Sequence, residues 1–240
     1  MPKKPFVHLG VCNLMVQNSY KTFVFDCDGV IFDSNQIKTD AFNKVGLEFG
    51  SDAAKELVNY HLQHGGVSRY RKFEYFWVEI LQRIYDANKI ESLVSQYALQ
   101  VCERLLHCSI SLSLLDLRKS TQNASWMVVS GGNQAELEYI FTERKIAPLF
   151  NKGVFGSPST KDEIIKREIS SGRLEFPALF IGDSRYDHEV AKRAGMDFIF
   201  IYDWTEFSSW REYCEVHRLA SYGSLADLNA AISSGRLEKS

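Results

Sequence analysis

The 240-residue chain is long enough to bury a sizeable core, either as one large domain or as a core with an insertion. Its 45% hydrophobic and 24% charged residues are ordinary for a soluble globular protein, and its formal net charge of -2 gives no reason to expect nucleic acid or an anionic membrane as a partner. No apolar stretch approaches the ~20 residues that a membrane-spanning helix needs.

The amino terminus and the cysteines predict a cytoplasmic protein. Residues 1–20 lack a sustained apolar segment with a small-residue cleavage site, so we do not expect a secretory signal. The cysteines are odd in number, scattered, and form no Cys-x-x-Cys pair, which is typical of reduced thiols and not of a disulfide framework or a zinc site. They are Cys12, Cys27, Cys102, Cys108 and Cys214.

The first predicted strand, Thr22–Phe25, is apolar and runs directly into Asp26-Cys27-Asp28-Gly29-Val30. Two carboxylates, separated by one residue, follow the carboxyl end of a buried strand. Open parallel sheets place their ligand-binding and catalytic residues at this end of their strands. The two carboxylates repel each other unless a cation neutralises them or one stays protonated. The pair is therefore a candidate for metal binding combined with nucleophilic or acid–base work. Taken alone, it is equally typical of an acidic turn that ends in Gly29.

The segment 34–117 shows helical periodicity and no convincing strand. Apolar residues such as Phe73, Phe76 and Trp77 recur at the spacing of one helix face, and we interpret the aromatic ones as core. We predict a helical cap domain over residues 34–117, inserted into an α/β core of residues 20–33 and 118–240, with short hinges near residues 32–35 and 115–120. The alternative is a single α/β domain with long helical excursions.

The second predicted strand, Trp126–Val129, leads into Ser130-Gly131-Gly132 and a helix over residues 135–144. A serine hydroxyl together with the free N–H groups of a helix amino terminus makes an anion-binding site. On its own, the motif is also compatible with an ordinary turn.

Lys161 stands at the start of a predicted helix, Lys161–Ile169, which Thr160 can cap. A lysine at this end of a helix opposes the helix dipole, which suggests an anionic partner. In isolation, a solvated surface lysine is the simpler interpretation.

A further strand, Ala178–Ile181, is followed by Gly182-Asp183, a helix from Tyr186 to Ala194 and a last strand, Phe198–Ile201. Asp183, with Asp187 about one helical turn later, suits a hard cation such as Mg²⁺, although Asp183 could instead cap the helix. Strands that alternate with helices predict an α/β fold, a Rossmann-like parallel sheet with helices on both faces.

The order of these motifs, each at a strand end, resembles the haloacid-dehalogenase-like hydrolase superfamily. More narrowly, residues 20–224 resemble its phosphoglycolate phosphatases and β-phosphoglucomutases, which have a helical cap after the first strand. The resemblance implies that Asp26 is the nucleophile and Asp28 the general acid/base. Ser130, the Gly131 amide and Lys161 would then bind the transferred phosphoryl group.

The same resemblance implies a Mg²⁺ cofactor. Its ligands would be the Asp26 carboxylate, the Asp28 backbone carbonyl and Asp183, with Asp187 as a further ligand or support. The loop Gly65-Gly66-Val67-Ser68-Arg69 resembles the specificity loop of this branch, so Arg69 is expected either to reach a second anionic group of the substrate or to face solvent.

We therefore expect a Mg²⁺-dependent phosphatase that acts on a small phosphorylated metabolite through an aspartyl-phosphate. A phosphosugar mutase and a non-catalytic phosphometabolite-binding module remain as alternatives. Ser130 lacks the Gly-x-Ser-x-Gly context of a serine hydrolase, and the later acidic positions of an EF-hand are missing after Asp26. The substrate, the oligomeric state, residues 1–20 and the segment around Trp204 and Trp210 have no interpretation at this stage.

Overall fold

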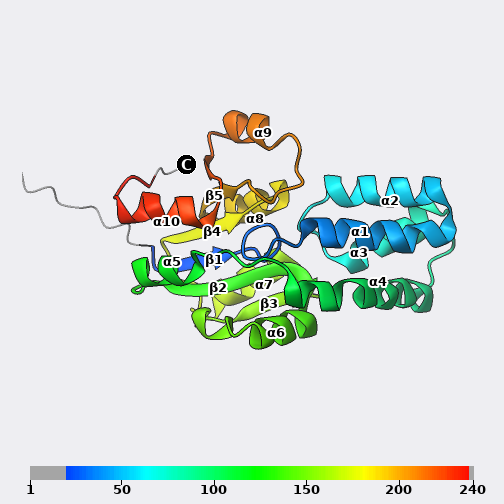
Figure 1. Cartoon of the computed structure of the whole chain (residues 1–240), viewed down its shortest axis with the longest axis horizontal. Coiled ribbons are helices and arrows are strands. Elements are labelled where there is room, and N and C mark those ends of the chain that lie inside the picture. Colours follow the sequence, from blue (N-terminus) through cyan, green and yellow to red (C-terminus); the bar gives the residue numbers. More distant parts are fainter. Residues whose placement is uncertain (1–19, 238–240) are drawn as a thin grey trace, which may run out of the picture.

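The computed structural model describes residues 20–237, which form one six-stranded parallel sheet with helices around it and a helical lobe at one end (Figure 1). The strand order is β3-β2-β1-β4-β5-β6. The strands are β1 (Thr22–Phe25), β2 (Ser125–Asn133), β3 (Val154–Ser157), β4 (Ala178–Gly182), β5 (Asp197–Ile201) and β6 (Ala220–Tyr222). The α-helices are α1 (Asn35–Gly46), α2 (Ser51–Gln63), α3 (Arg69–Tyr75), α4 (Ala87–His107), α5 (Leu114–Ser120), α6 (Gln134–Glu143), α7 (Lys161–Ser170), α8 (Arg185–Ala194), α9 (Trp210–His217) and α10 (Leu225–Ser233).

The predicted α/β, Rossmann-like fold is confirmed. Strand β1 lies in the middle of the sheet, where Thr22 pairs in parallel with Ser125 of β2 and with Ala178 of β4. All four residues of β1 are buried, because the strand has neighbours on both sides and helices over both faces. The sequence prediction missed β3 and β6. Both are very short and only partly apolar, so their hydrophobic signal is weak.

Alternate side chains of the strands point to opposite faces of the sheet, and each face has its own hydrophobic cluster. Phe23 and Phe25 belong to the cluster that includes side chains of α5, α6 and α10, whereas Val24 belongs to the cluster that includes side chains of α7 and α8. The helices therefore cover both faces, as the alternation of strands and helices predicts.

Helices α1 to α4 form the lobe that extends from the sheet in Figure 1. Between α3 and α4 the chain adds a π-helical turn, Phe76–Ile80. Buried aromatic side chains fill the lobe, among them Phe42, Phe73, Phe76 and Tyr97, and they are continuous with the hydrophobic cluster on one face of the sheet. We call these four helices and their connections the cap. The division of the chain into domains at residues 34 and 117 stays a prediction.

The two connections between the cap and the sheet run side by side. The Asp33 amide donates to the Ser109 carbonyl (3.0 Å), the Ser111 amide donates to the Ile31 carbonyl (2.9 Å), and Phe32 forms an antiparallel bridge with Ile110. Beyond this pair of linkers, α5 packs against α10 beside the sheet. The linkers thus join the cap to the core through a narrow backbone ladder.

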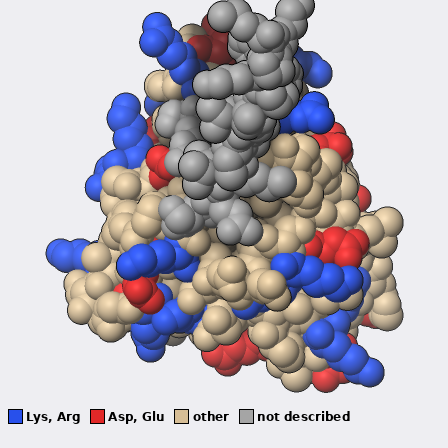
Figure 2. Space-filling model, turned by 90° about the vertical axis from the view of Figure 1, so that its left-hand side faces the viewer, with Lys and Arg blue, Asp and Glu red and all other residues tan. Residues whose placement is uncertain are grey.

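Residues 1–19 lie outside the described residues, and with them Cys12 and the segment for which no secretory signal is expected. Cys27, Cys102, Cys108 and Cys214 are free thiols. Within residues 20–237, no helix has both the length and the apolar character that crossing a bilayer requires. Figure 2 shows the end of the molecule away from the cap, where Lys and Arg side chains are interspersed with Asp, Glu and other residues.

Candidate active site

Three buried carboxylates meet at the carboxyl edge of the sheet. Asp26 follows β1, Asp183 follows the neighbouring strand β4, and Asp187 lies in the first turn of α8. One carboxylate oxygen from each residue lies within 4.8 Å of the others. Adjacent parallel strands end at the same edge, so the two sequence motifs are brought together by strand pairing. Helix α8 is capped by Ser184, whose side chain accepts from the Asp187 amide, so the alternative interpretation of Asp183 as a helix cap is wrong.

The electrostatics of this cluster favour a cation. Burial, reinforced by the nearby Asp187, raises the pKa of Asp26 to about 7. Burial and the charge of Asp26 also raise the pKa of Asp183 well above its usual value. A positive charge placed among these carboxylates would lower both pKa values, because it stabilises their ionised forms.

Lys161 provides one such charge. Its Nζ lies 2.8 Å from Asp26 Oδ1 and 2.5 Å from Asp187 Oδ1, and its side chain is 1% exposed. A capping box between Thr160 and Glu163 begins α7 at Lys161 and so fixes the position from which the lysine reaches the cluster. The interpretation of Lys161 as a solvated surface residue is therefore wrong.

The residues present also fit a divalent metal. Asp26 Oδ1 is buried, and among residues 20–237 its close polar partner is Lys161 Nζ at 2.8 Å, which leaves a lone pair of this oxygen for a cation. The donors are carboxylate oxygens, the ligands that Mg²⁺ prefers. Gly29 leaves room beside them, since a Cβ at this position would lie 2.0 Å from Asp183 Oδ2. The side chains that could hold the ion are those of Asp26, Asp183 and Asp187.

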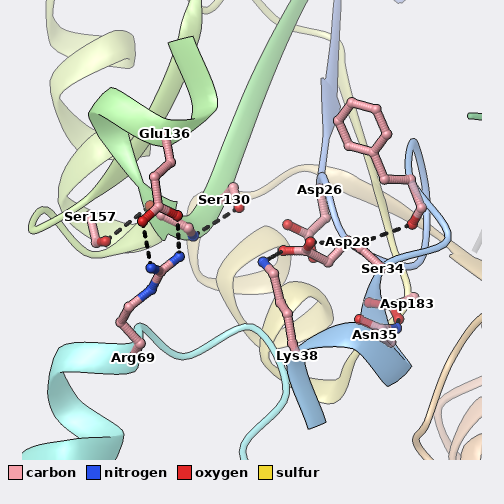
Figure 3. A network of polar contacts seen from close by, with 12 residues as sticks. Asp26, Asp28, Ser34, Asn35, Lys38, Arg69, Ser130, Glu136, Ser157 and Asp183 are labelled. Atoms are coloured by element: carbon pink, nitrogen blue, oxygen red, sulfur yellow. Dashed lines mark hydrogen bonds and ion pairs between the residues drawn. The ribbon is translucent and has the colours of Figure 1, made fainter. Parts of the chain in front are cut away.

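The second carboxylate of the opening motif, Asp28, has different partners. It forms an ion pair with Lys38 of α1 and accepts a hydrogen bond of 2.6 Å from Ser34 (Figure 3). Burial alone would raise the pKa of Asp28, but Lys38 and Ser34 outweigh it and hold this pKa below its usual value. The two acids of the motif therefore differ in protonation behaviour: burial and Asp187 outweigh Lys161 at Asp26, whereas Lys38 and Ser34 outweigh burial at Asp28.

Ser34, Asn35 and Lys38 were not predicted as site residues, and no sequence signal distinguishes them from ordinary residues at the start of a helix. Asn35 Nδ2 donates to Asp183 Oδ2 (2.7 Å) and to the Trp204 carbonyl (2.8 Å). Thr205 Oγ1 donates to the Asp183 carbonyl (2.6 Å). The segment around Trp204, which had no functional interpretation, thus supports the position of Asp183.

Ser130 is fully buried, and its Oγ accepts a hydrogen bond from the Gly132 amide (3.0 Å). The predicted strand end at Val129 is wrong, because β2 continues through Ser130 and Gly131 to Asn133, with an irregular register against β3. Asn133 then caps α6 at the Glu136 amide. The extended strand carries Gly131 to the edge of the cavity between the sheet and the cap.

The glycine-rich cap loop, residues 65–67, packs directly onto this part of the core. A Cβ on Gly131 would lie 2.4 Å from the Gly66 carbonyl oxygen, and a Cβ on Gly66 would lie 3.4 Å from Lys161 Nζ. Gly66 has φ +77°, a conformation that glycine adopts without strain. The absence of side chains on both sides allows the cap loop to approach the residues predicted to bind phosphate.

Between the cap and the sheet edge lies a cavity of about 830 Å³. Asp26, Asp28 and Asp183 line it from the core, and Lys38, Arg69 and Lys72 line it from the cap. Arg69 is only 5% exposed, so the expectation of a solvent-facing side chain is wrong. Both of its terminal nitrogens donate to Glu136 of α6, at 2.7 and 2.6 Å (Figure 3).

Comparison with known proteins agrees with the fold. The profile of the haloacid dehalogenase-like hydrolases matches residues 23–201, which is more than half of the chain. The chain therefore belongs to the haloacid dehalogenase-like hydrolase family, as its motifs predict. No curated protein matches the chain.

Several solved structures share this fold at low sequence identity. A predicted phosphatase from Clostridium acetobutylicum is 18% identical with a TM-score of 0.69, covering 90% of this chain and 99% of its own. A Bacteroides vulgatus protein provisionally named a β-phosphoglucomutase is 17% identical with a TM-score of 0.69, covering 91% of each chain. A Lactobacillus plantarum protein provisionally named a phosphoglycolate phosphatase is 16% identical with a TM-score of 0.64, covering 87% of this chain and 97% of its own. At this identity the likeness establishes the fold alone.

Proposed function

We propose that the protein is a Mg²⁺-dependent phosphatase that hydrolyses a small phosphorylated metabolite through an aspartyl-phosphate on Asp26. The observation that carries this proposal is the position of Asp26, which lines the cavity beside Lys161 while Asp28 lies two residues further on. The solved structures of similar fold that are named phosphatases agree with it.

In the first step, an oxygen of the Asp26 carboxylate attacks phosphorus, and the bond from phosphorus to the ester oxygen breaks. Lys161 lies next to the attacking group and offsets the repulsion between a carboxylate and a phosphate. Mg²⁺ held by Asp26, Asp183 and Asp187 would add positive charge at the same place. Ser130 and the Gly131 amide would bind the transferred phosphoryl group.

Asp28 is the proposed proton carrier. It gives a proton to the leaving ester oxygen in the first step and takes one from the water that attacks the aspartyl-phosphate in the second, which returns Asp26 and releases inorganic phosphate. Its ion pair with Lys38 holds the carboxylate in the ionised form that the second step needs. The acid step needs a proton on Asp28: the water step of one turnover leaves a proton there for the next, and the ion pair with Lys38 has to loosen for Asp28 to keep it.

A phosphosugar mutase is the second candidate. In that reaction the aspartyl-phosphate returns its phosphoryl group to a bound sugar and not to water. The loop that covers the site contains a Gly-Val-Ser-Arg stretch similar to one in β-phosphoglucomutases, and one solved structure of similar fold is provisionally given that name. A non-catalytic binding module is less favoured, because binding alone needs no acid at Asp28.

The test is the release of inorganic phosphate from p-nitrophenyl phosphate with Mg²⁺ or with EDTA. Wild-type protein should hydrolyse it with Mg²⁺, and Asp26→Asn should lose this activity by a factor of ~10³ or more. Asp33→Asn, which changes an exposed carboxylate close by, serves as the control. Near-normal turnover in Asp26→Asn would exclude the covalent mechanism. Conversion of a sugar 1-phosphate to its 6-phosphate, primed by a bisphosphate, would favour the mutase.

A further inference from the structure

Lys72 of α3 is a buried lysine that faces the cavity from the cap side. Its side chain is 3% exposed, and it lines the cavity that Asp26 lines from the core. An ammonium group removed from water costs several kcal/mol unless a counter-charge and hydrogen bonds replace the hydration. The partners of Lys72 therefore decide whether it is a structural or a binding residue.

The other cationic side chains that line the cavity all have carboxylate partners. Lys38 is paired with Asp28, Arg69 with Glu136, and Arg185 with Glu189. Over residues 20–237, no carboxylate oxygen lies within ion-pair distance of Lys72. Its Nζ instead contacts His61 Nδ1 at 2.7 Å and, more weakly, the His61 carbonyl at 3.5 Å.

The contact with His61 has a defined direction. Thr39 uses its single hydroxyl proton to donate to Glu206 Oε2 (2.7 Å), so its oxygen accepts from His61 Nε2 at 3.0 Å. With the proton on Nε2, His61 Nδ1 is an acceptor and takes one N–H of Lys72. The ammonium form of Lys72, which an anion bound beside it would favour, has three N–H donors, and the neutral amine has two. At least one donor of Lys72 therefore remains for a molecule in the cavity.

We propose that Lys72 binds a second anionic group of the substrate, at the opposite side of the cavity from the transferred phosphate. The inference rests on the proposed phosphatase activity. It assigns the substrate to phosphate esters that carry a further carboxylate or phosphate group. Arg69, the residue that the sequence suggests for such a group, already donates hydrogen bonds from both terminal nitrogens to Glu136.

Two pairs of probes differ in the second charge. The first is 3-phosphoglycerate against glycerol 3-phosphate, which tests a carboxylate, and the second is fructose 1,6-bisphosphate against fructose 6-phosphate, which tests a phosphate. Wild-type protein should favour the more anionic member of at least one pair in kcat/KM. Lys72→Met should reduce that preference by about ten- to hundredfold, mainly through KM, because it removes one charged hydrogen bond.

Two further variants separate a binding role from a structural one. Lys72→Arg keeps the charge and should retain part of the preference. Lys55→Met removes an exposed cap lysine and should retain all of it. If wild type shows no preference in either pair, or if Lys72→Met keeps the preference, the inference is wrong.

Failure of the proposed function has a separate signature. If wild type hydrolyses neither p-nitrophenyl phosphate nor any of the four probes, the phosphatase proposal fails, and the inference is decided by binding alone. Calorimetric titration of the probes into Asp26→Asn and into Asp26→Asn/Lys72→Met then measures the same preference without turnover. A preference that disappears with Lys72 supports the anion site, and one that persists, or is never present, overturns it.

Discussion

Lys38 of cap helix α1 and Asp28 of the core form an ion pair across the linker that joins the cap to the core. The Lys38 side chain is 13% exposed and that of Asp28 17%. Because Asp28 also accepts from Ser34, its carboxylate is held from two sides. The pair thus connects the position of the cap to the position of the proposed acid/base.

This ion pair should appear as a coupling in a double-mutant cycle. At pH 8, Lys38→Met and Asp28→Asn should each lower the free energy of unfolding by about 1–3 kcal/mol, since each leaves a largely buried partner without its counter-charge. The double variant should lose less than the sum of the two, with a coupling of about 1–2 kcal/mol in urea denaturation. Lys44→Met, at an exposed position of the same helix, is the control and should change stability by less than ~0.5 kcal/mol. Additive single effects would show that the pair contributes nothing.

The contact between Gly66 and Gly131 predicts that the cap loop cannot tolerate a side chain beneath it. In Gly131→Ala the new Cβ would meet the Gly66 carbonyl at 2.4 Å, and a backbone group cannot move aside as a flexible side chain does. The loop should therefore lift, and kcat/KM for p-nitrophenyl phosphate should fall by tenfold or more.

Amide hydrogen exchange gives a readout of this change that does not depend on chemistry. Residues 64–68 should lose protection in Gly131→Ala. Gly65→Ala is the matched control, because its Cβ would lie 3.3 Å from Ser184 Cβ, a close contact that a shift of a few tenths of an ångström relieves. Unchanged protection in Gly131→Ala would mean that the loop does not close on this strand.

The acidic cluster predicts stabilisation by Mg²⁺. A ligand that binds only the folded state, at a hundred times its Kd, raises the free energy of unfolding by about 2.7 kcal/mol. Thermal unfolding of wild type should thus shift upward with Mg²⁺ relative to EDTA. Asp183→Asn removes one of the clustered charges and should shift much less, whereas Asp203→Asn, an exposed carboxylate after β5, should behave as wild type. Equal shifts in both variants would place the ion elsewhere.

The elements that carry the site are predictable from the sequence because their signals are local. An apolar run followed by an acid identifies β1 with Asp26 and β4 with Asp183, and Thr160 with Glu163 marks the start of α7. Strand pairing then places the acids at one edge of the sheet. These signals suffice for the fold and for the family.

The contacts that tune the site are not local, and the sequence does not reveal them. Arg69 and Glu136 are 67 residues apart, and Asn35 and Asp183 are 148 apart. Single residues on amphipathic helices carry no sign of which distant group they will meet. The burial of Lys161 and Lys72 is equally hidden, because lysine is usually exposed and only the assembled cap and core enclose these two.

The buried Lys72 finally predicts an unusual pH dependence of stability. Burial, followed by the charge of Lys38, lowers the pKa of Lys72 from 10.5 to about 7. Between pH 7 and about 10 the unfolded chain therefore holds a proton on this residue that the folded chain has released. Stability rises with pH wherever the unfolded state binds more protons, with a slope of at most ~1.4 kcal/mol per pH unit for one group. The contribution of Lys72 thus increases through this window and is flat below it.

Comparison with Lys72→Met isolates this contribution, because the variant keeps the volume of the side chain and removes the titrating group. The charged neighbours are Lys38, Asp28, Glu206 and Lys161, with His61 in contact. The pKa values of Lys38 and Lys161 are raised and those of Asp28 and His61 are lowered, so none of these four titrates in the window. The free energy of unfolding of wild type minus that of Lys72→Met, from urea denaturation at several pH values, should therefore climb from pH 7 to 10. Lys55→Met should give a flat difference across the same range. If the difference in the free energy of unfolding for Lys72→Met also stays constant with pH, Lys72 has an ordinary pKa and is not shielded from water.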